Sequence, residues 1–160
     1  MAYIGVRPSP QYSLEENERV TEQRQAPPPK PVPYPSAETM TFWEKVNEGE
    51  LWIQRCKDCS KPYFYPRYFC PTCLGTNVEW FKTSGRGKLH TYMINHRPPP
   101  SFQAEAPYAI AIVELDEGVR MMTNIHGIEN TPEKLKLDMP LRVVFEEITA
   151  GRKVPYWVPA

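Results

Sequence analysis

The sequence lacks any apolar run near the length of a membrane-spanning helix, although 41% of its residues are hydrophobic, and we expect no association with a membrane. An excess of charge is also missing, because 19 Lys and Arg residues are balanced by 19 Asp and Glu residues. A chain without net charge has no general electrostatic attraction for nucleic acid or anionic lipid. The first ten residues contain one arginine, two prolines and no apolar core, so we expect no signal peptide there.

Glycine is scarce beside proline, with 8 glycines against 19 prolines. Because proline fixes the backbone, this ratio predicts long extended and stiff stretches. Residues 26–35 contain six prolines, which predicts a polyproline-like spacer. Before this spacer, Ser13 and Glu16 match a capping box, which predicts a helix to about Gln25. We treat residues 1–35 as one helical and proline-rich arm, which is either a solvated linker or a clamp on a neighbouring subunit.

All four cysteines lie in two Cys-x-x-Cys pairs, and ten residues separate the pairs. Two such pairs facing each other supply four thiolates in a tetrahedron, the arrangement of a closed structural Zn²⁺ site. Disulfides and free thiols are the alternatives, but disulfides suit small secreted domains. Reduced, zinc-bound cysteines indicate a cytoplasmic protein. The predicted metal ligands are Cys56, Cys59, Cys70 and Cys73.

Residues 36–81 predict a short helix followed by a rubredoxin-like zinc ribbon. The helix is expected to start at the N-cap Ser36 and to end before Gly49, which occupies the favoured position after a helix. An apolar strand at 51–55 leads into the first cysteine pair, and residues 78–81 close the ribbon. Between the pairs, residues 62–69 include five tyrosines or phenylalanines, and several of these must face a partner or ligand because a small ribbon has little interior.

Residues 82–160 predict five strands with turns between them. Alternation marks 88–95 and an apolar run marks 108–115, and a hairpin turn follows the latter. Thr131 and Pro132 match the start of a short helix. Three strands, a short helix and two strands are the order of an OB-fold, a small, partly open barrel. The expected strands span 88–95, 108–115, 119–125, 141–145 and 154–158. The fold class is therefore mainly β, with a helical arm, a zinc ribbon and a C-terminal five-stranded OB-fold barrel.

Several short motifs taken together resemble the family of acyl-CoA-associated zinc-ribbon/OB-fold proteins, long catalogued as a domain of unknown function. The resemblance covers about residues 36–160 and leaves the arm outside. The motifs are, in chain order, Phe42-Trp43, Tyr65-Pro66-Arg67, Ser84-Gly85-Arg86-Gly87, His96-Arg97-Pro98-Pro99-Pro100, Val113-Glu114-Leu115-Asp116-Glu117-Gly118 and Met139-Pro140-Leu141-Arg142-Val143-Val144-Phe145.

This resemblance implies a companion of thiolase-superfamily enzymes, such as the benzoylsuccinyl-CoA thiolase, the retro-aldolases of steroid side-chain breakdown, and the archaeal assembly of acetoacetyl-CoA thiolase with hydroxymethylglutaryl-CoA synthase. In that family the ribbon/OB subunit packs on a thiolase-like subunit and helps to shape the channel for coenzyme A. Because the chain carries a separate arm and no fused hydratase domain, we expect it to resemble the stand-alone partners most. The expected function is that of an accessory subunit of a thiolase-type complex in a degradation pathway, with a steroid retro-aldolase complex as the alternative.

The residues themselves agree with a non-catalytic role. Thiolase chemistry needs a reactive cysteine and a second acid or base, yet zinc takes every cysteine here, which leaves His90, His96 and His126 without a nucleophile to serve. Cations and aromatic faces remain as candidates for contacts to coenzyme A, and three aromatic residues as candidates for the partner interface. The candidates for coenzyme A are Arg67, Arg86, Lys88, Arg97, Tyr65, Tyr68 and Tyr92, and those for the partner are Trp43, Phe42 and Phe64.

Two rival functions belong to other classes. Zinc ribbons and OB-folds both bind single-stranded nucleic acid, but a basic groove should then accompany them, and the barrel region carries many carboxylates instead. A stand-alone acyl-CoA carrier or hydrolase is the other rival, and no Ser/His/Asp elbow or hotdog-type helix pattern supports it.

Overall fold

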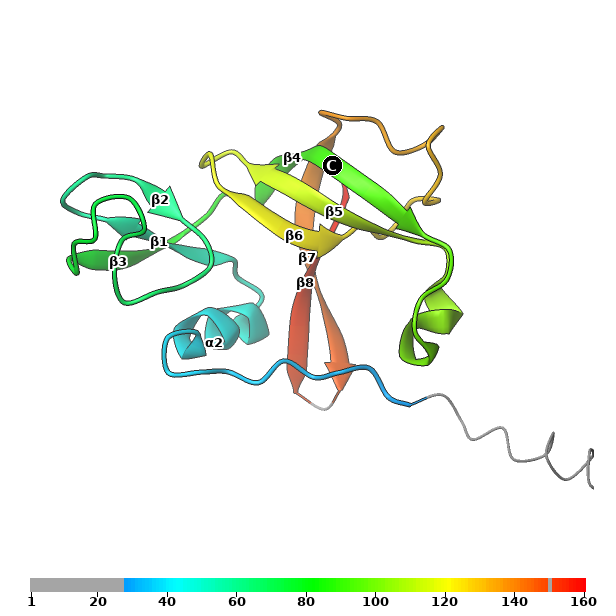
Figure 1. Ribbon diagram of the computed structural model, residues 1–160, viewed down its shortest axis with the longest axis horizontal. Helices are drawn as coiled ribbons and strands as arrows, with labels where there is room; N and C mark the ends of the chain where they lie inside the picture. Colours follow the sequence, from blue (N-terminus) through cyan, green and yellow to red (C-terminus); the bar gives the residue numbers. More distant parts are fainter. Residues whose placement is uncertain (1–27, 150) are drawn as a thin grey trace, which may run out of the picture.

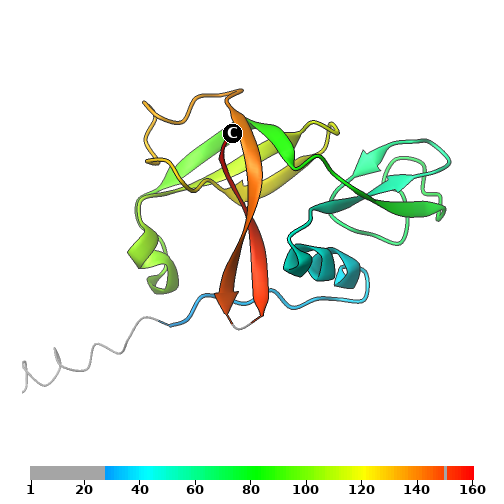
Figure 2. The ribbon, with the colours of Figure 1, turned by 180° about the vertical axis from the view of Figure 1, so that it is seen from behind.

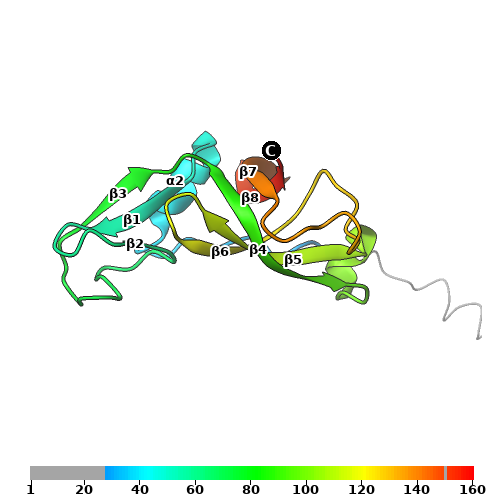
Figure 3. The same ribbon diagram turned by 90° about the horizontal axis from the view of Figure 1, so that it is seen from above.

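The computed structural model describes residues 28–149 and 151–160, so the helix expected over 13–25 lies outside the described residues. The described residues form two β-sheets that lie side by side (Figures 1 and 3). The predicted mainly β class, with a four-cysteine ribbon and a five-stranded barrel, is confirmed. The elements are α2 (Met40–Glu48), β1 (Trp52–Cys56), β2 (Pro62–Tyr63), β3 (Val78–Lys82), β4 (Arg86–Asn95), the 3₁₀ helix η1 (Pro100–Glu105), β5 (Tyr108–Leu115), β6 (Arg120–Asn124), β7 (Pro140–Thr149) and β8 (Arg152–Pro159).

The smaller sheet has the strand order β2-β1-β3, and all of its pairs are antiparallel. Its central strand β1 buries Ile53 and Gln54 and delivers Cys56 at its end. Strand β3 then leads through a short connection into β4, the first strand of the larger sheet (Figure 3). The metal-binding ribbon and the barrel are therefore consecutive in the chain and joined at the β3–β4 connection.

The larger sheet has the order β6-β5-β4-β7-β8. Residues of β5 alternate between buried and half-buried along the whole strand, as expected for a strand with one face on a core. A parallel bridge between Ile125 and Trp157, both fully buried, brings the end of β6 against β8 and nearly closes the barrel. Strands β7 and β8 continue beyond the barrel as a long twisted hairpin (Figure 2).

Helix α2 packs against this hairpin and contributes to the core of the barrel rather than to that of the ribbon. Its buried residues Phe42 and Val46 belong to the same apolar cluster as Leu89 and Trp157, and the backbone N–H of Lys153 on β8 donates to the side-chain oxygen of Asn47 at 3.0 Å. Gly49 follows the helix with a φ of 86°, as predicted. The helix begins at Met40, because residues 36–39 form a turn in which the backbone N–H of Thr39 donates to the carbonyl of Ser36 at 3.0 Å.

Residues 28–35, the end of the predicted spacer, have no regular secondary structure and lie against their own chain. Arg152 donates to the carbonyl of Pro33 at 3.4 Å, and Lys30 pairs with Glu105 while its ammonium lies 5.6 Å from the centre of the Phe102 ring. Figures 1 and 2 show this segment passing α2 and the tip of the β7–β8 hairpin. We call residues 28–35 the proline strap.

The short helix expected after Thr131 is replaced by a single turn. The backbone N–H groups of Lys134 and Leu135 both donate to the carbonyl of Thr131, but the chain then turns away, and Asp138, with a φ of 61°, donates its N–H to the carbonyl of Leu89 at 2.8 Å. This bond to β4 ends the turn before a helix can propagate, because a helix of one turn has few bonds of its own to stabilise it. Leu135 is fully buried in the barrel core.

No helix among the described residues has the length and apolarity needed to span a membrane.

Candidate metal centre and binding pockets

The four predicted ligands meet at one point. Their sulfur atoms all lie within 4.8 Å of one another, with 3.5 Å between Cys56 and Cys73 and 3.6 Å between Cys59 and Cys70. The four cysteines form no disulfide. A zinc ion with bonds of about 2.3 Å to four sulfurs in a tetrahedron would set neighbouring sulfurs about 3.8 Å apart. The sulfur positions therefore fit a structural zinc ion with four thiolate ligands.

Both cysteine pairs adopt the same turn, which explains why the Cys-x-x-Cys spacing brings the two sulfur atoms of each pair together. Ser60 and Leu74, each directly after the second cysteine of its pair, have φ values of 60° and 63°. This left-handed residue turns the chain back, so that Cys56 donates its N–H to the carbonyl of Lys61, and Cys70 donates to that of Gly75. Backbone N–H groups inside each turn consequently point towards the sulfur atoms.

The hydrogen bonds of the turn lower the pKa of the Cys70 thiol below its usual value. Backbone N–H groups of Cys73 and Thr72 lower the pKa of the Cys70 thiol to about 6, and the N–H of Thr72 lies 3.3 Å from the Cys70 sulfur. These donors stabilise a thiolate, the form that zinc binds. When all four cysteines coordinate, zinc takes up their negative charge and has no open position, so the centre holds the ribbon together and offers no site for catalysis.

An apolar pocket of about 430 Å³ lies between the proline strap, α2, the loop after β2, and strands β6 and β8. Its walls include Phe42, Trp43, Phe64 and Tyr65, and Tyr156 forms a further side. His126 supports Tyr156 from behind, because the two rings stack at 3.9 Å between centroids while the imidazole Nδ1 lies 3.0 Å from a carboxylate oxygen of Glu146. The pocket lies where the barrel closes only loosely, between β6 and β8.

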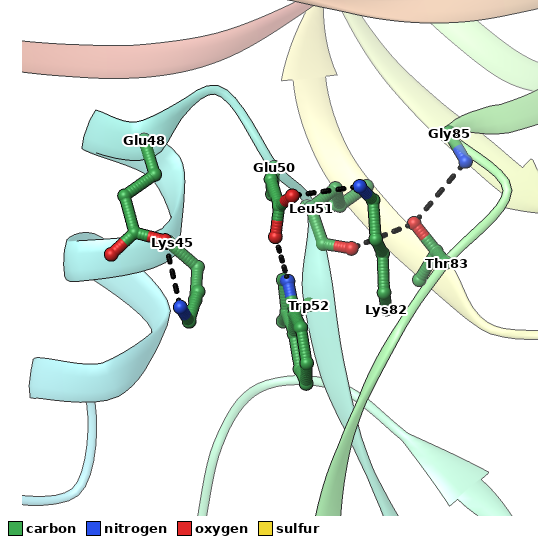
Figure 4. A network of polar contacts seen from close by, with 8 residues as sticks. All are labelled: Lys45, Glu48, Glu50, Leu51, Trp52, Lys82, Thr83 and Gly85. Atoms are coloured by element: carbon green, nitrogen blue, oxygen red, sulfur yellow. Dashed lines mark hydrogen bonds and ion pairs between the residues drawn. The ribbon is translucent and has the colours of Figure 1, made fainter.

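A second, more polar pocket of about 330 Å³ lies at the seam between ribbon and barrel. Figure 4 shows the network that supports it: Glu50 accepts from Lys82 and from the indole N–H of Trp52, each at 2.7 Å, and the buried Thr83 donates to the carbonyl of Leu51 at 3.0 Å. The bond from Lys82 is the main reason that the pKa of Glu50 lies below its usual value. We call this the seam pocket, and its cationic lining residues are Lys82, Arg86 and Arg142.

The structure distributes the candidate coenzyme A residues over several places instead of one cleft. Tyr65 lines the apolar pocket, and Arg86 lines the seam pocket. Lys88 pairs with Asp138 at 3.2 Å and with Glu114 at 3.6 Å, so carboxylates of the chain itself already balance its charge. The remaining candidates are Arg67 and Tyr68, exposed on the ribbon loop, Tyr92, which packs against the barrel core, and Arg97, exposed after the far end of β4.

The three candidates for the partner interface also lie in different environments. Phe42 is 2% exposed and packs within the core of this chain, so its side chain is unavailable to a partner. Trp43 and Phe64 are half-buried against the same core and line the apolar pocket. Lys82 and Arg142 are pocket residues that the sequence does not single out, because only the pairing of β4 with β7 brings Arg142 to the seam pocket. Residue spacing alone carries no signal for that pairing.

Comparison with known proteins places the chain in a class. The family model described as the ChsH2 rubredoxin-like zinc ribbon domain matches residues 43–79, and the model of the ChsH2 C-terminal OB-fold domain matches residues 80–146. The chain is thus a zinc-ribbon/OB-fold protein. It belongs to the ChsH2 family of such proteins, whose members also carry the designation DUF35, and the resemblance drawn from the sequence motifs is confirmed.

Three similar proteins illustrate the family. A "DUF35 domain-containing scaffold protein" of Methanocaldococcus jannaschii is 40% identical over 66% of this chain and 75% of its own length. A "probable enoyl-CoA hydratase alpha subunit" of Thermomonospora curvata is 33% identical over 88% of this chain, which spans only 44% of that subunit. Among solved structures, a chain of an "Ltp2-ChsH2(DUF35) aldolase" matches with a TM-score of 0.70 and 32% identity, over 79% of this chain and 98% of that chain.

Proposed function

We propose that the chain is a non-catalytic accessory subunit of a thiolase-type complex that cleaves a carbon–carbon bond of an acyl-CoA, where it stabilises the thiolase-like subunit and helps to bind coenzyme A. The observation that carries this proposal is the match to a chain of the Ltp2-ChsH2(DUF35) aldolase over nearly the whole of that chain. A scaffold protein and an enoyl-CoA hydratase subunit among the relatives support the same role. The aldolase match favours a steroid retro-aldolase complex equally, and that is the second candidate.

The chemistry of the chain supports a companion rather than an enzyme. All four cysteines belong to the metal centre, so none is left as the nucleophile of thiolase chemistry. His126 pairs with Glu146 and stacks on Tyr156, so both contacts give its imidazole ring a structural role. We therefore assign the catalytic residues to the partner, and the thiols, reduced and metal-bound, favour a cytoplasmic location.

Two surfaces support contacts to a ligand and to a partner. The apolar pocket offers an uncharged wall for the pantetheine arm or acyl group of a thioester, and pockets of this size accept small molecules. The loop between the cysteine pairs exposes Tyr65, Tyr68 and Phe69 by 44%, 59% and 43%. Large aromatic side chains are enriched at protein interfaces, so we propose that these three residues, together with Trp43 and Phe64, contact the thiolase-like subunit.

The test is recovery of the partner by the tagged full chain from its native cytosol, with quantitative mass spectrometry. A thiolase-like protein in stoichiometric amount is the expected result. Phe69→Ala should reduce its recovery, whereas Leu137→Ala, at a side chain that is 61% exposed outside the aromatic loop, should not. Recovery of nucleic acid that survives nuclease and moderate salt would instead favour the single-strand-binding rival.

The recovered complex then separates the two candidate reactions. Thiolysis consumes free coenzyme A, whereas retro-aldol cleavage does not, so the cleavage rate of an acyl-CoA substrate is measured with and without added coenzyme A. A complex without any thiolase-like protein, or one that cleaves no acyl-CoA, would refute the proposed function.

A further inference from the structure

Two arginines lie directly opposite each other in the larger sheet. Arg86 on β4 pairs in register with Arg142 on β7, and both side chains are exposed and line the seam pocket. Side chains in this position have Cβ atoms about 4.5–5.5 Å apart, and like charges there destabilise the sheet. The pair therefore costs folding free energy unless an anion lies between the two guanidinium groups.

The rest of the chain does not compensate this pair. Within the described residues, neither Arg86 nor Arg142 forms an ion pair. By contrast, Arg55 on β1 pairs with a glutamate of β3, and Arg120 on β6 with a glutamate of β5. These two arginines are thus balanced by a carboxylate on the neighbouring strand, whereas each arginine of the seam pocket faces another arginine.

The charges around the pocket favour an external anion. Its lining contains Lys82, Arg86 and Arg142 against Glu50, which gives three positive charges minus one negative charge, or +2, in a chain whose formal net charge is zero. Lys82 and Trp52 occupy both carboxylate oxygens of Glu50 (Figure 4). The excess charge therefore resides on the two arginines.

The backbone of the turn beside the pocket has no donors to spare. The N–H of Ser84 donates to a carboxylate oxygen of Glu117 at 2.6 Å, that of Gly85 to the hydroxyl of Thr83 at 3.3 Å, and that of Arg86 to the hydroxyl of Ser84 at 3.2 Å. An anion in the pocket must consequently be held by guanidinium groups, whose planar donors match the oxygens of a phosphate in pairs.

We propose that Arg86 and Arg142 together form a phosphate-binding site at the seam between ribbon and barrel. In assigning the phosphate to coenzyme A, this inference rests on the proposed function. The seam pocket and the apolar pocket share no lining residue, so the charged and the apolar parts of the ligand are recognised at separate places. Arg142, which residue spacing could not single out, becomes a ligand-binding residue.

The first test uses inorganic phosphate as the probe. For the zinc-loaded full chain, phosphate should raise the thermal midpoint relative to chloride at equal ionic strength. Arg142→Gln and Arg86→Gln should each abolish this response, and in chloride each variant should melt no lower than the unaltered chain because the like-charge pair is relieved. Lys134→Gln, which removes the same charge from another exposed side chain, should respond to phosphate as the unaltered chain does. Variants that keep the full phosphate response would overturn the proposal.

The second test separates this site from the proposed function. Calorimetric titration with coenzyme A should show affinity at least about tenfold weaker for Arg142→Gln than for Lys134→Gln, the expected effect of losing hydrogen bonds to a charged group, whereas binding of pantetheine should be equal in both variants. Phosphate stabilisation through the arginines without any binding of coenzyme A would leave the site standing and refute its assignment to coenzyme A. Binding of coenzyme A that both arginine variants retain unchanged would refute the assignment of this site to coenzyme A and leave the proposed function intact.

Discussion

Removal of zinc is expected to unfold the small sheet and to leave the barrel folded. The buried cluster beside the metal centre consists of Cys56, Tyr63 and Cys70, and two of these are metal ligands, while Ile53 and Gln54 are the buried residues of β1 that lie outside this cluster. A core this small supplies less than the roughly 3–5 kcal/mol that small scaffolds reach, whereas a structural zinc site contributes on the order of 10 kcal/mol or more. The metal is therefore the dominant source of stability for β1–β3.

The barrel has its own core and does not depend on the metal in the same way. Its buried cluster includes Leu89, Val113, Leu135 and Trp157 and extends to Phe42 of α2. Helix α2 directly precedes the ribbon in the chain but packs in the core of the barrel. The metal-dependent unit therefore begins after α2. On this basis, chelation should destabilise residues from β1 to β3 and spare α2.

The assay is hydrogen exchange at single amides, combined with metal analysis that should give one zinc ion per chain. After chelation, the amides of Gln54 on the central strand β1 and of Phe81, which pairs with Ile53 across β1 and β3, should lose protection, while those of Val113 and Met121, which pair across β5 and β6, should keep it. Cys56→Ala should reproduce this pattern, and added zinc should restore only the unaltered chain. Retained protection at Gln54 without metal would refute the reasoning, and so would loss of protection at Val113.

Three further predictions concern packing and ionisation. Leu135→Ala, at a fully buried side chain, should lower the free energy of unfolding by about 2–5 kcal/mol in denaturant titration, against less than about 0.5 kcal/mol for the exposed Leu137→Ala; equal effects would contradict the assigned core. Gly87→Ala should cost about 1–3 kcal/mol, because the added Cβ would lie 2.5 Å from the backbone oxygen of Glu114, and an unchanged thermal midpoint would refute this. Burial raises the pKa of Tyr63 from 10.0 to about 12. The unfolded chain therefore ionises first, and stability present below pH 10 is lost as the pH rises towards 12; Tyr63→Phe should flatten that loss in alkaline unfolding curves, and an unchanged slope would contradict the assignment.

Local signals in the sequence predicted the metal centre and most of the fold. Each cysteine pair closes within a few residues through its own turn, so its spacing alone indicates the ligand geometry. Gly49 ends α2 as predicted because a residue with positive φ is needed at that point. The apolar run at 108–115 predicted a strand buried on both faces, and the structure shows the strand, but β5 buries one face and leaves the other half-buried.

Features that depend on contacts between distant residues were not predictable in the same way. Thr131 and Pro132 carry the local pattern of a helix start, yet the hydrogen bond from Asp138 to Leu89 on β4 ends the turn, which no local pattern reveals. The opposition of Arg86 and Arg142 likewise follows from strand register across 56 positions of sequence. The cations chosen from the sequence share a charge but not a location, so the structure brings only Arg86 into the seam pocket.

The position of the metal explains how a centre without catalytic chemistry can serve a binding function. Zinc fixes both ends of the loop that carries Tyr65, Tyr68 and Phe69, and the buried Gln54 on β1 anchors its middle by accepting from the N–H of Arg67 at 2.7 Å. That loop also supplies Phe64 to the wall of the apolar pocket. Chelation should therefore abolish recovery of the thiolase-like partner while the phosphate response of Arg86 and Arg142 persists, because these arginines lie on barrel strands with their own core. Partner recovery by the metal-free chain would show that the interface lies elsewhere, on the barrel.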